Sequence, residues 1–343
     1  MQNEKYNKPI AYWLLFGAFM VLTMVVIGGI TRLTHSGLSI VTWQPIKGVL
    51  PPMNEVEWQQ AFEAYKKIPE YKKVHHYFTL NEYKQIFFWE YLHRMLGRSL
   101  GLIFLIPFLF FYFKGRIQNK KLLKRLFLIF LLGGIQGFAG WYMVKSGLVE
   151  NTSVDHIRLA LHMSLALVIL TTILWTVFTL LIPGNKTTNS RFTHNFLKVF
   201  IFLIIVQIIY GGLTAGLKAG HIFPTYPKMG ENWIPDISKT VFKEESWLSL
   251  IDFAPSVQFI HRWLGFLLFI VFLCVAFRLK KQKFSLLNKA IALSVFLIII
   301  QYLLGISVII YKVPINIAVL HQVTAFLLFI SLLLVLYLSK KRI

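Results

Sequence analysis

The stretch FFWEYLHRMLGR, residues 87–98, leads through two residues into GLIFLIPFLFFYF, residues 101–113, which carries no charge. A helix of about 20 mostly apolar residues crosses the hydrocarbon core of a bilayer. The run therefore predicts a membrane-spanning helix over 87–113. Its first turns nevertheless hold ionisable side chains, which in a spanning helix usually serve a function. They are Glu90, His93, Arg94 and Arg98.

The whole chain has the composition of an integral membrane protein. Hydrophobic residues make up 56% of its 343 residues and charged residues 15%, against about 25% charged in soluble domains. Seven further apolar runs are long enough to span a bilayer. We therefore predict an all-α protein with eight transmembrane helices. The other seven predicted spans are 11–30, 126–144, 157–182, 196–216, 255–277, 290–311 and 317–338.

Basic residues predict the orientation of these spans, because Lys and Arg accumulate in cytoplasmic loops. With the N-terminus inside, Glu4 is the only acidic residue on the cytoplasmic side. The pattern predicts N-in, C-in topology. It also places the net charge of +22 beside anionic lipid headgroups, so we expect a bilayer and no nucleic acid as partner. The basic segments are 114–125, 191–198, 278–289 and the C-terminal SKKRI.

Two connections on the predicted outer side are long, residues 31–86 and 217–254. The first contains GVLPPMNEVEWQQAFEAYKK, in which Pro51 and Pro52 suit the start of a helix. Trp58, Phe62 and Tyr65 would lie on one side of that helix, which predicts a short amphipathic helix at the interface. No Arg- and Ser-rich extension precedes the first span, which favours a bacterial cytoplasmic (inner) membrane over a mitochondrial one.

The second half of the chain repeats the first. Because each half has an even number of spans, the copies share one orientation, which is the parallel type of repeat. The sequence thus predicts two four-helix bundles, residues 1–184 and 185–343. The matching segments are VIGGITRL (26–33) with IYGGLTAGL (209–217), WEYLHRMLGR (89–98) with VQFIHRWLGF (257–266), GGIQGFAGWYMV (133–144) with IIIQYLLGISVI (298–309), and IRLALHMSLAL (157–167) with INIAVLHQVTAFL (315–327).

One histidine falls near the predicted outer end of every second span, four to six residues in, or roughly 6–10 Å deep. Each half thus has two imidazoles on opposed helices, the usual axial ligands of a membrane b-type haem. The alternative is that they form interhelical hydrogen bonds of about 1 kcal/mol each. Four histidines at one depth favour the haem. They are His93, His162, His261 and His321.

The remaining histidines are predicted to lie in loops or just before a span. We expect such residues to be exposed to solvent. His35 and His221 are the two that we keep as candidates for lining a site. The others are His75, His76, His156 and His194.

The two halves differ three residues before the first histidine, with Glu90 in one and Gln258 in the other. Residues i and i+3 share a helix face, so Glu90 is expected on the side that His93 faces. A carboxylate there suits a base or charge stabiliser in a substrate pocket. The alternative is simple pairing with Arg94 or Arg98. Neutral Gln258 suits a permanently bound haem.

Both halves also carry the dipeptide His-Arg, which places Arg94 and Arg262 near the outer interface. A guanidinium group binds carboxylates in a bidentate manner, and the propionates of a haem are carboxylates. Snorkelling of these side chains to lipid headgroups is the alternative that remains open.

Several of these stretches together resemble haem A synthase, and the similarity covers almost the whole chain. The absence of paired cysteines in the outer loops is similar to the branch shared by many Gram-negative bacteria and mitochondria. The most specific segment is EWQQAFEAYKKIPEYK (57–72). The others are GGITRLTHSGLSIVTWQPIKGVLPP (28–52), WEYLHRMLGR (89–98) and FIHRWLG (259–265).

The resemblance implies oxidation of the C8 methyl of haem O to a formyl group, which gives haem A for terminal oxidases. It also implies a resident haem b held by His261 and His321, and a haem O substrate near His93 and His162. The position matching Glu90 is regarded as catalytically important in that family. Two routes fit the sequence: successive hydroxylation to a gem-diol, and electron removal from the methyl followed by capture of water.

The resemblance also implies partners: haem O synthase by the logic of the pathway, and an electron acceptor or donor such as a quinone or a small redox protein. The second hypothesis is a di-haem b-type electron-transfer cytochrome, in which Glu90 would have no chemical role. A transporter with parallel repeats is the third. It would need polar groups near the midplane, and the spans offer few beyond Gln136, Gln207 and Gln301.

Overall fold

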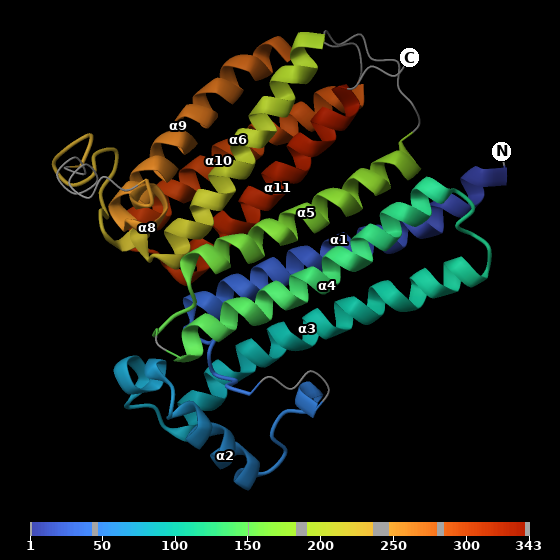
Figure 1. The fold of residues 1–343 in the computed structure, drawn as a ribbon. Coiled ribbons are helices and arrows are strands. Elements are labelled where there is room, and N and C mark those ends of the chain that lie inside the picture. Colours follow the sequence, from blue (N-terminus) through green and yellow to red (C-terminus); the bar gives the residue numbers. More distant parts are fainter. Residues whose placement is uncertain are drawn as a thin grey trace. The chain divides into compact units, whose positions relative to one another are not determined.

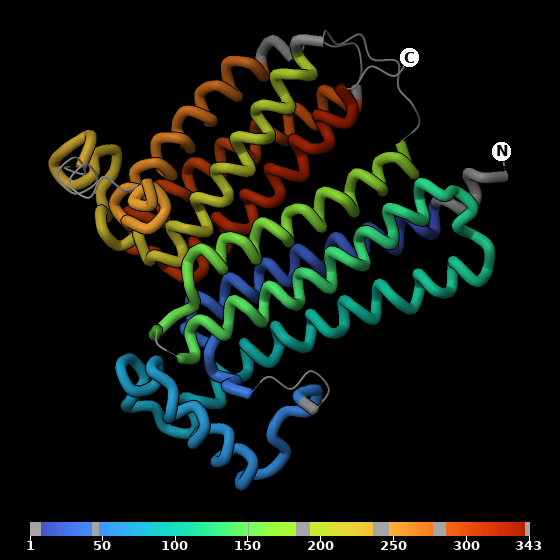
Figure 2. Tube along the Cα trace, viewed as in Figure 1, coloured from blue at the N-terminus to red at the C-terminus, as the bar shows by residue number. Residues whose placement is uncertain are grey.

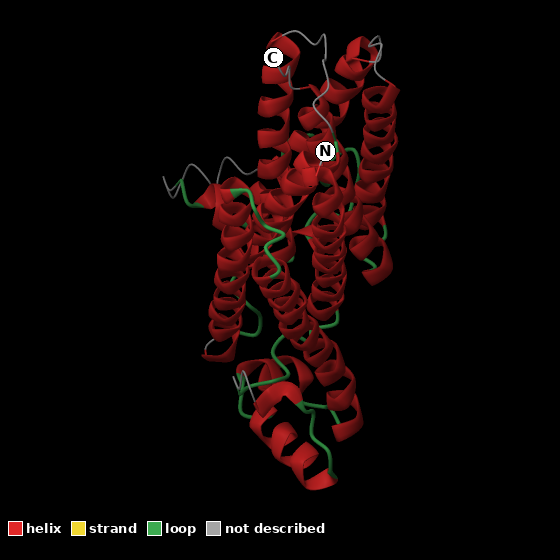
Figure 3. Cartoon of the chain, turned by 90° about the vertical axis from the view of Figure 1, so that its right-hand side faces the viewer, coloured by secondary structure: helices red, strands yellow, loops and turns green. Residues whose placement is uncertain are grey.

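The computed structural model describes residues 2–42, 47–149, 151–182, 191–235, 247–279 and 285–339. Within these ranges the chain is built of helices and contains no β-strand. Figure 3 shows the helices in red and the connections in green. The predicted all-α class is confirmed.

Eight of the described helices are long and apolar enough to cross a membrane. Each one covers a predicted span, so the prediction of eight spans is confirmed. The orientation of the helices in the membrane and the repeat remain predictions. The helices are α1 (Gln2–Leu33), α3 (Leu80–Phe113), α4 (Lys120–Val149), α5 (His156–Leu181), α6 (Arg191–Gly216), α9 (Ala254–Leu279), α10 (Ser285–Ile310) and α11 (Ile315–Ser339).

Helix α3 begins seven residues before the predicted span. Thr79 and Glu82 form a capping box at its start, in which the Glu82 carboxylate accepts a hydrogen bond from the Thr79 backbone N–H at 2.6 Å. This reciprocal cap stabilises the polar turns that hydropathy does not detect. The first turns of α3 therefore extend the helix beyond its apolar run.

The chain divides into two compact units, Met1–Ala18 with Leu167–Ile343, and Phe19–Ala166. The boundaries of these units fall within α1 and α5. The predicted halves 1–184 and 185–343 meet at a point that lies outside the described residues, and they remain a prediction.

In the first of these units, α6, α9, α10 and α11 pack in a bundle (Figures 1 and 2). Phe200 of α6 and Phe272 of α9 stack with their ring centroids 5.2 Å apart. Ser294 of α10 donates a hydrogen bond of 2.9 Å to Ser331 of α11. The tight apolar packing and the small polar pair fix the register of the four helices.

In the second unit, the short helix α2 (Glu55–Tyr65) packs on the first turns of α3. It is the predicted amphipathic helix, but it begins after Pro51 and Pro52, because the Asn54 side chain caps it by accepting from the Glu57 N–H at 2.9 Å. Phe62 and Tyr65 are buried against α3. The remaining short helices in the chain are η1 (Lys47–Val49), η2 (Tyr71–His75), η3 (Ala219–His221) and α8 (Ser249–Asp252).

The prediction that His75 is a solvated surface residue is wrong. Its side chain is buried, stacks on Phe78 and shares a hydrogen bond of 2.7 Å with the Tyr65 hydroxyl. Burial, together with the Glu70 carboxylate, holds the pKa of Tyr65 well above its usual value, so the hydroxyl remains protonated. The aromatic cluster between α2 and α3 thus includes a polar centre.

Candidate functional site

Each of the four membrane histidines lies against a glycine of a neighbouring helix. A methyl group in place of the glycine hydrogen would approach the histidine Cε1 to about 3 Å, closer than side chains normally pack. Only glycine lets these helices and rings come so close. The pairs are His93 with Gly28 (3.1 Å), His162 with Gly140 (3.0 Å), His261 with Gly211 (3.3 Å) and His321 with Gly305 (3.0 Å).

The three glutamines considered above for a transporter contact three of these histidines. Gln207 Nε2 donates to the backbone oxygen of His261 at 2.9 Å, and Gln136 Nε2 donates to that of His162 at 3.1 Å. Gln301 Nε2 lies 3.3 Å from His321 Nε2. These three glutamines therefore lie at the histidines.

The histidines of the second half face each other. The ring centroids of His261 and His321 are 6.5 Å apart and the ring planes are nearly perpendicular. Two imidazoles that bind one metal ion from opposite sides have centroids about 6 Å apart, given metal–nitrogen distances of about 2 Å.

The donor set also fits a haem. The Nδ1 atoms of all four histidines are buried and have no hydrogen-bond partner, and a buried ring nitrogen is costly when unpaired. Among the described residues no group of three or more His, Cys, Asp or Glu side chains could hold a metal ion. Paired imidazoles are the donor set that a b-type haem uses.

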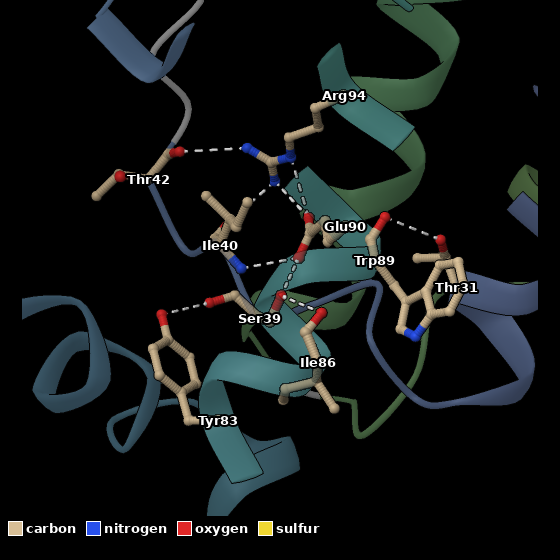
Figure 4. Close-up of polar contacts among 9 residues, drawn as sticks. All are labelled: Thr31, Ser39, Ile40, Thr42, Tyr83, Ile86, Trp89, Glu90 and Arg94. Atoms are coloured by element: carbon tan, nitrogen blue, oxygen red, sulfur yellow. Dashed lines mark hydrogen bonds and ion pairs between the residues drawn. The ribbon is translucent and has the colours of Figure 1, made fainter. Parts of the chain in front are cut away.

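Glu90 lies on α3 and is only 3% exposed. Figure 4 shows its carboxylate between Arg94 and the connection that follows α1. Oε1 accepts from Arg94 Nη2 at 2.6 Å and from Arg94 Nε at 3.0 Å. Oε2 accepts from the Ser39 hydroxyl and from the Ile40 backbone N–H, both at 2.8 Å. The carboxylate thus accepts four hydrogen bonds, two on each oxygen.

Arg94 is held by the same connection. Its Nη2 donates to the backbone oxygen of Ile40 at 2.9 Å, and Tyr83 donates to that of Ser39 at 3.1 Å. The structure therefore brings Glu90 and Arg94 together with residues 39–42. Among the described residues no hydrogen bond or ion pair joins Glu90 to His93. The pairing with Arg94, expected as the alternative to a catalytic role, is present.

The second half uses its matching residues in the same way. Gln258 Nε2 donates to the backbone oxygen of Phe223 at 3.3 Å. Arg262 Nη2 donates to the backbone oxygens of three residues in the connection after α6, at 2.9–3.1 Å. Helix α3 therefore holds the connection after α1, and helix α9 holds the connection after α6. The spacing of residues in the sequence does not reveal these contacts. The three acceptors are Thr225, Pro227 and Lys228.

The two other candidate histidines differ from each other. His35 follows α1 with a φ of +53°, and its ring meets that of His75 edge to face, with centroids 6.1 Å apart. His221 lies in η3 and is exposed. Neither is in contact with the four membrane histidines in the described contacts.

The glycine contacts give a direct prediction for stability. Gly305→Ala should lower the free energy of unfolding by about 1–3 kcal/mol, because the added methyl group overpacks the His321 ring. Thermal unfolding of the detergent-solubilised protein measures this. Gly17→Ala is the matched control, because open space surrounds Gly17. An equal effect of the two substitutions on unfolding would contradict the steric role of Gly305.

Eight of the described helices are long and apolar enough to cross a membrane, which defines a multi-pass membrane protein, and four of its histidines each lie against a glycine. Residues 11–333 match the family described as cytochrome oxidase assembly protein. The chain therefore belongs to the cytochrome oxidase assembly protein family.

Individual relatives are similar over almost their full length. The chain is 41% identical over 329 residues to the heme A synthase of Flavobacterium psychrophilum, which covers 94% of this chain and 96% of the relative. It is 43% identical over 339 residues to that of Nitrosospira multiformis, with 97% and 94% covered. It is 41% identical over 328 residues to that of Rickettsia bellii, with 94% and 96% covered. The resemblance to haem A synthase is confirmed.

Proposed function

We propose that the chain is a haem A synthase, a membrane oxidoreductase that converts the C8 methyl of haem O into a formyl group and so makes haem A. Membership of the family and the names of the relatives support the activity. The observation that carries the proposal is the contact that each of the four histidines makes with a glycine of a neighbouring helix. It supplies two pairs of ligands, one for a resident haem and one for the substrate.

His261 and His321 are the residues that would hold a resident haem b, and His93 and His162 would flank the haem O substrate. The separation of the His261 and His321 rings suits axial ligation. Neutral Gln258 beside one pair and the Glu90 carboxylate beside the other support this division, since only the substrate site needs a charge. When bound, the haem b would supply electron transfer.

Glu90 has the chemical properties of a proton acceptor or charge stabiliser at the substrate site. Arg94 donates two hydrogen bonds to Oε1, while Oε2 accepts hydrogen bonds from Ser39 and Ile40. Oε2 is therefore the atom at which a proton released during oxidation of the methyl group would be taken up. The same contacts fix residues 39–42.

The two arginines have different capacities for haem propionates. Arg262 Nη1 is buried and has no hydrogen-bond partner, so it can bind a propionate without losing an existing contact. Arg94 is already bound to Glu90 and to backbone oxygens. We therefore assign propionate binding first to Arg262, and to Arg94 only alongside its bond to Glu90.

We place the protein in the cytoplasmic membrane of a bacterium, with both chain ends inside and the haem sites towards the outer side. The basic connections support this orientation. Haem O synthase is the partner that would deliver the substrate. A quinone or a small redox protein would exchange electrons with the resident haem.

Conversion tests the proposed activity directly. Expression in a host that makes haem O but no haem A should produce haem A in the membranes, measured by chromatography of extracted haems. The same host carrying the empty vector is the control. A host that accumulates haem O and forms no haem A would contradict the activity and favour a di-haem electron-transfer cytochrome.

A further inference from the structure

One buried donor of the Arg262 guanidinium is unused. Nη2 donates to the backbone oxygens of Thr225, Pro227 and Lys228 at 2.9–3.1 Å. Nη1 is buried and has no hydrogen-bond partner among the described residues. A buried charged donor without a partner is costly, whereas a guanidinium binds a carboxylate strongly. The surroundings of Nη1 therefore favour a bound anion.

Two tyrosine hydroxyls lie beside this guanidinium. The guanidinium carbon of Arg262 is 5.6 Å from the centroid of the Tyr226 ring, and the Tyr226 hydroxyl is hydrogen-bonded to that of Tyr302. Each hydroxyl has one hydrogen to donate, and only one of the two hydrogens lies between the oxygens. Among the described residues neither hydroxyl has a second hydrogen-bond partner. The hydroxyl pair thus keeps one donor for a further acceptor.

Neighbouring residues hold both tyrosines in place. Tyr302 of α10 stacks on Phe269 of α9, with ring centroids 4.3 Å apart and ring planes 4° from parallel. Thr225, the residue before Tyr226, accepts a hydrogen bond on its hydroxyl oxygen from the Gly230 backbone N–H at 2.8 Å. Donors that are held in position before a ligand binds lose little conformational freedom when it does.

The unused donors belong to residues that adjoin the proposed resident site. Arg262 directly follows His261 in α9. Tyr302 directly follows Gln301, whose Nε2 lies 3.3 Å from His321 Nε2. The donors thus come from the next residues along the chain to groups at both rings of the histidine pair. A haem bound by that pair would bring its propionates, which are carboxylates, into the same half of the chain.

The first half has no tyrosines at the matching positions. The residue that matches Tyr302 is Gly137, and the connection after α1 contains no tyrosine between residues 34 and 46. Arg94, which matches Arg262, is instead bonded to the Glu90 carboxylate. The unused donors are therefore a feature of the half that is proposed to hold a haem permanently.

We infer that Arg262 Nη1 and the hydroxyl pair of Tyr226 and Tyr302 bind one propionate of the resident haem, and so keep that haem from exchanging. The inference rests on the proposed function, in which the second half holds haem b. A carboxylate has enough lone pairs to accept from a guanidinium and from a phenol at once. Hydrogen bonds to a charged group are stronger than those between neutral groups, so the two tyrosines slow the release of the haem.

Removing both hydroxyls tests the inference without measuring activity. The double variant Y226F/Y302F keeps both rings and loses only the hydroxyl groups. Protein purified after co-expression with a haem O source is incubated with excess apomyoglobin, which takes up released haem, and the haems that remain bound are separated by chromatography. Haem b should leave the variant about tenfold faster, the effect of losing one hydrogen bond to a charged group. The release of haem O and haem A from the first half should be unchanged.

Tyr311→Phe is the matched control, because Tyr311 directly follows α10 and is exposed. It should release haem b at the rate of the unmodified protein. Equal rates of haem b release from Y226F/Y302F and the unmodified protein would overturn the inference. An equal acceleration for haem O and haem A would also overturn it, because the whole fold would then have loosened. Absence of haem b, or of both haem O and haem A, from the unmodified protein would instead reject the proposed function.

The reduction potential of the resident haem b is an independent readout. Hydrogen bonds around a haem tune its potential. Loss of the hydroxyl donors leaves more negative charge on the propionate, which stabilises ferric iron, so the potential of haem b should fall in Y226F/Y302F and stay unchanged in Tyr311→Phe. A redox titration followed by absorbance measures this. An unchanged potential in the double variant would show that the hydroxyls do not bind the propionate.

Discussion

Replacing His261 or His321 with alanine should strip the resident haem b from the purified protein. Each ring faces the other across 6.5 Å, so either substitution leaves a single axial ligand and an alanine too short to replace it. We expect the haem b content to fall at least tenfold, measured by the reduced-minus-oxidised absorbance of the pyridine complex. Haem A formation should stop with it, because electron transfer then lacks its carrier.

His221→Ala is the matched control, because His221 is exposed and apart from the ring pair. It should retain full haem b. Normal haem b in both His261→Ala and His321→Ala would show that other residues hold the cofactor.

Replacing Glu90 with alanine should abolish conversion of haem O while leaving the resident haem b spectrum intact. The substitution removes the carboxylate and leaves the Arg94 charge, itself only 11% exposed, without its partner. Loss of one partner from a buried ion pair costs about 3–5 kcal/mol, so we also expect a lower unfolding temperature. Chromatography of haems and thermal unfolding measure the two effects.

Glu90→Gln separates the chemical role of the carboxylate from its structural one. The amide keeps the shape and can still accept from Ser39 and Ile40, so the fold should suffer less than in the alanine variant, while conversion should still stop. Glu63→Gln, an exposed glutamate of α2, should change neither quantity. Haem A formation at the normal rate in Glu90→Gln would refute the proton-acceptor role and leave Glu90 as the anchor of residues 39–42.

The spans could be predicted because an apolar run of the right length has few other uses in a protein. The early start of α3 could not be predicted from hydropathy, although Thr79 and Glu82 form a recognisable capping box in the sequence. His75 was wrongly expected at the surface, since its burial depends on the folding of α2 against α3.

The repeat predicted four histidines as site candidates, which remains a prediction, whereas their glycine and glutamine contacts could not be predicted. Those contacts depend on the rotation and register of two helices, which a sequence pattern does not specify. The repeat nevertheless contained the signal, because Gly28 aligns with Gly211 and Gly140 with Gly305. Likewise, the anchoring of residues 39–42 by Glu90 and Arg94 needed the three-dimensional arrangement.

The two halves share several contacts and differ at particular residues. The shared part is the histidine–glycine contact and the arginine that fixes a connection. The difference is Glu90 in one half against Gln258 in the other. A duplicated haem-binding bundle can acquire a substrate site through such a difference without a change of fold.

The haem inventory of the protein purified after co-expression with a haem O source tests the central claim most directly. The account predicts one haem b per chain that resists exchange, together with haem O or haem A that exchanges with added haem. Two equivalents of haem b per chain, neither of which exchanges, would contradict it.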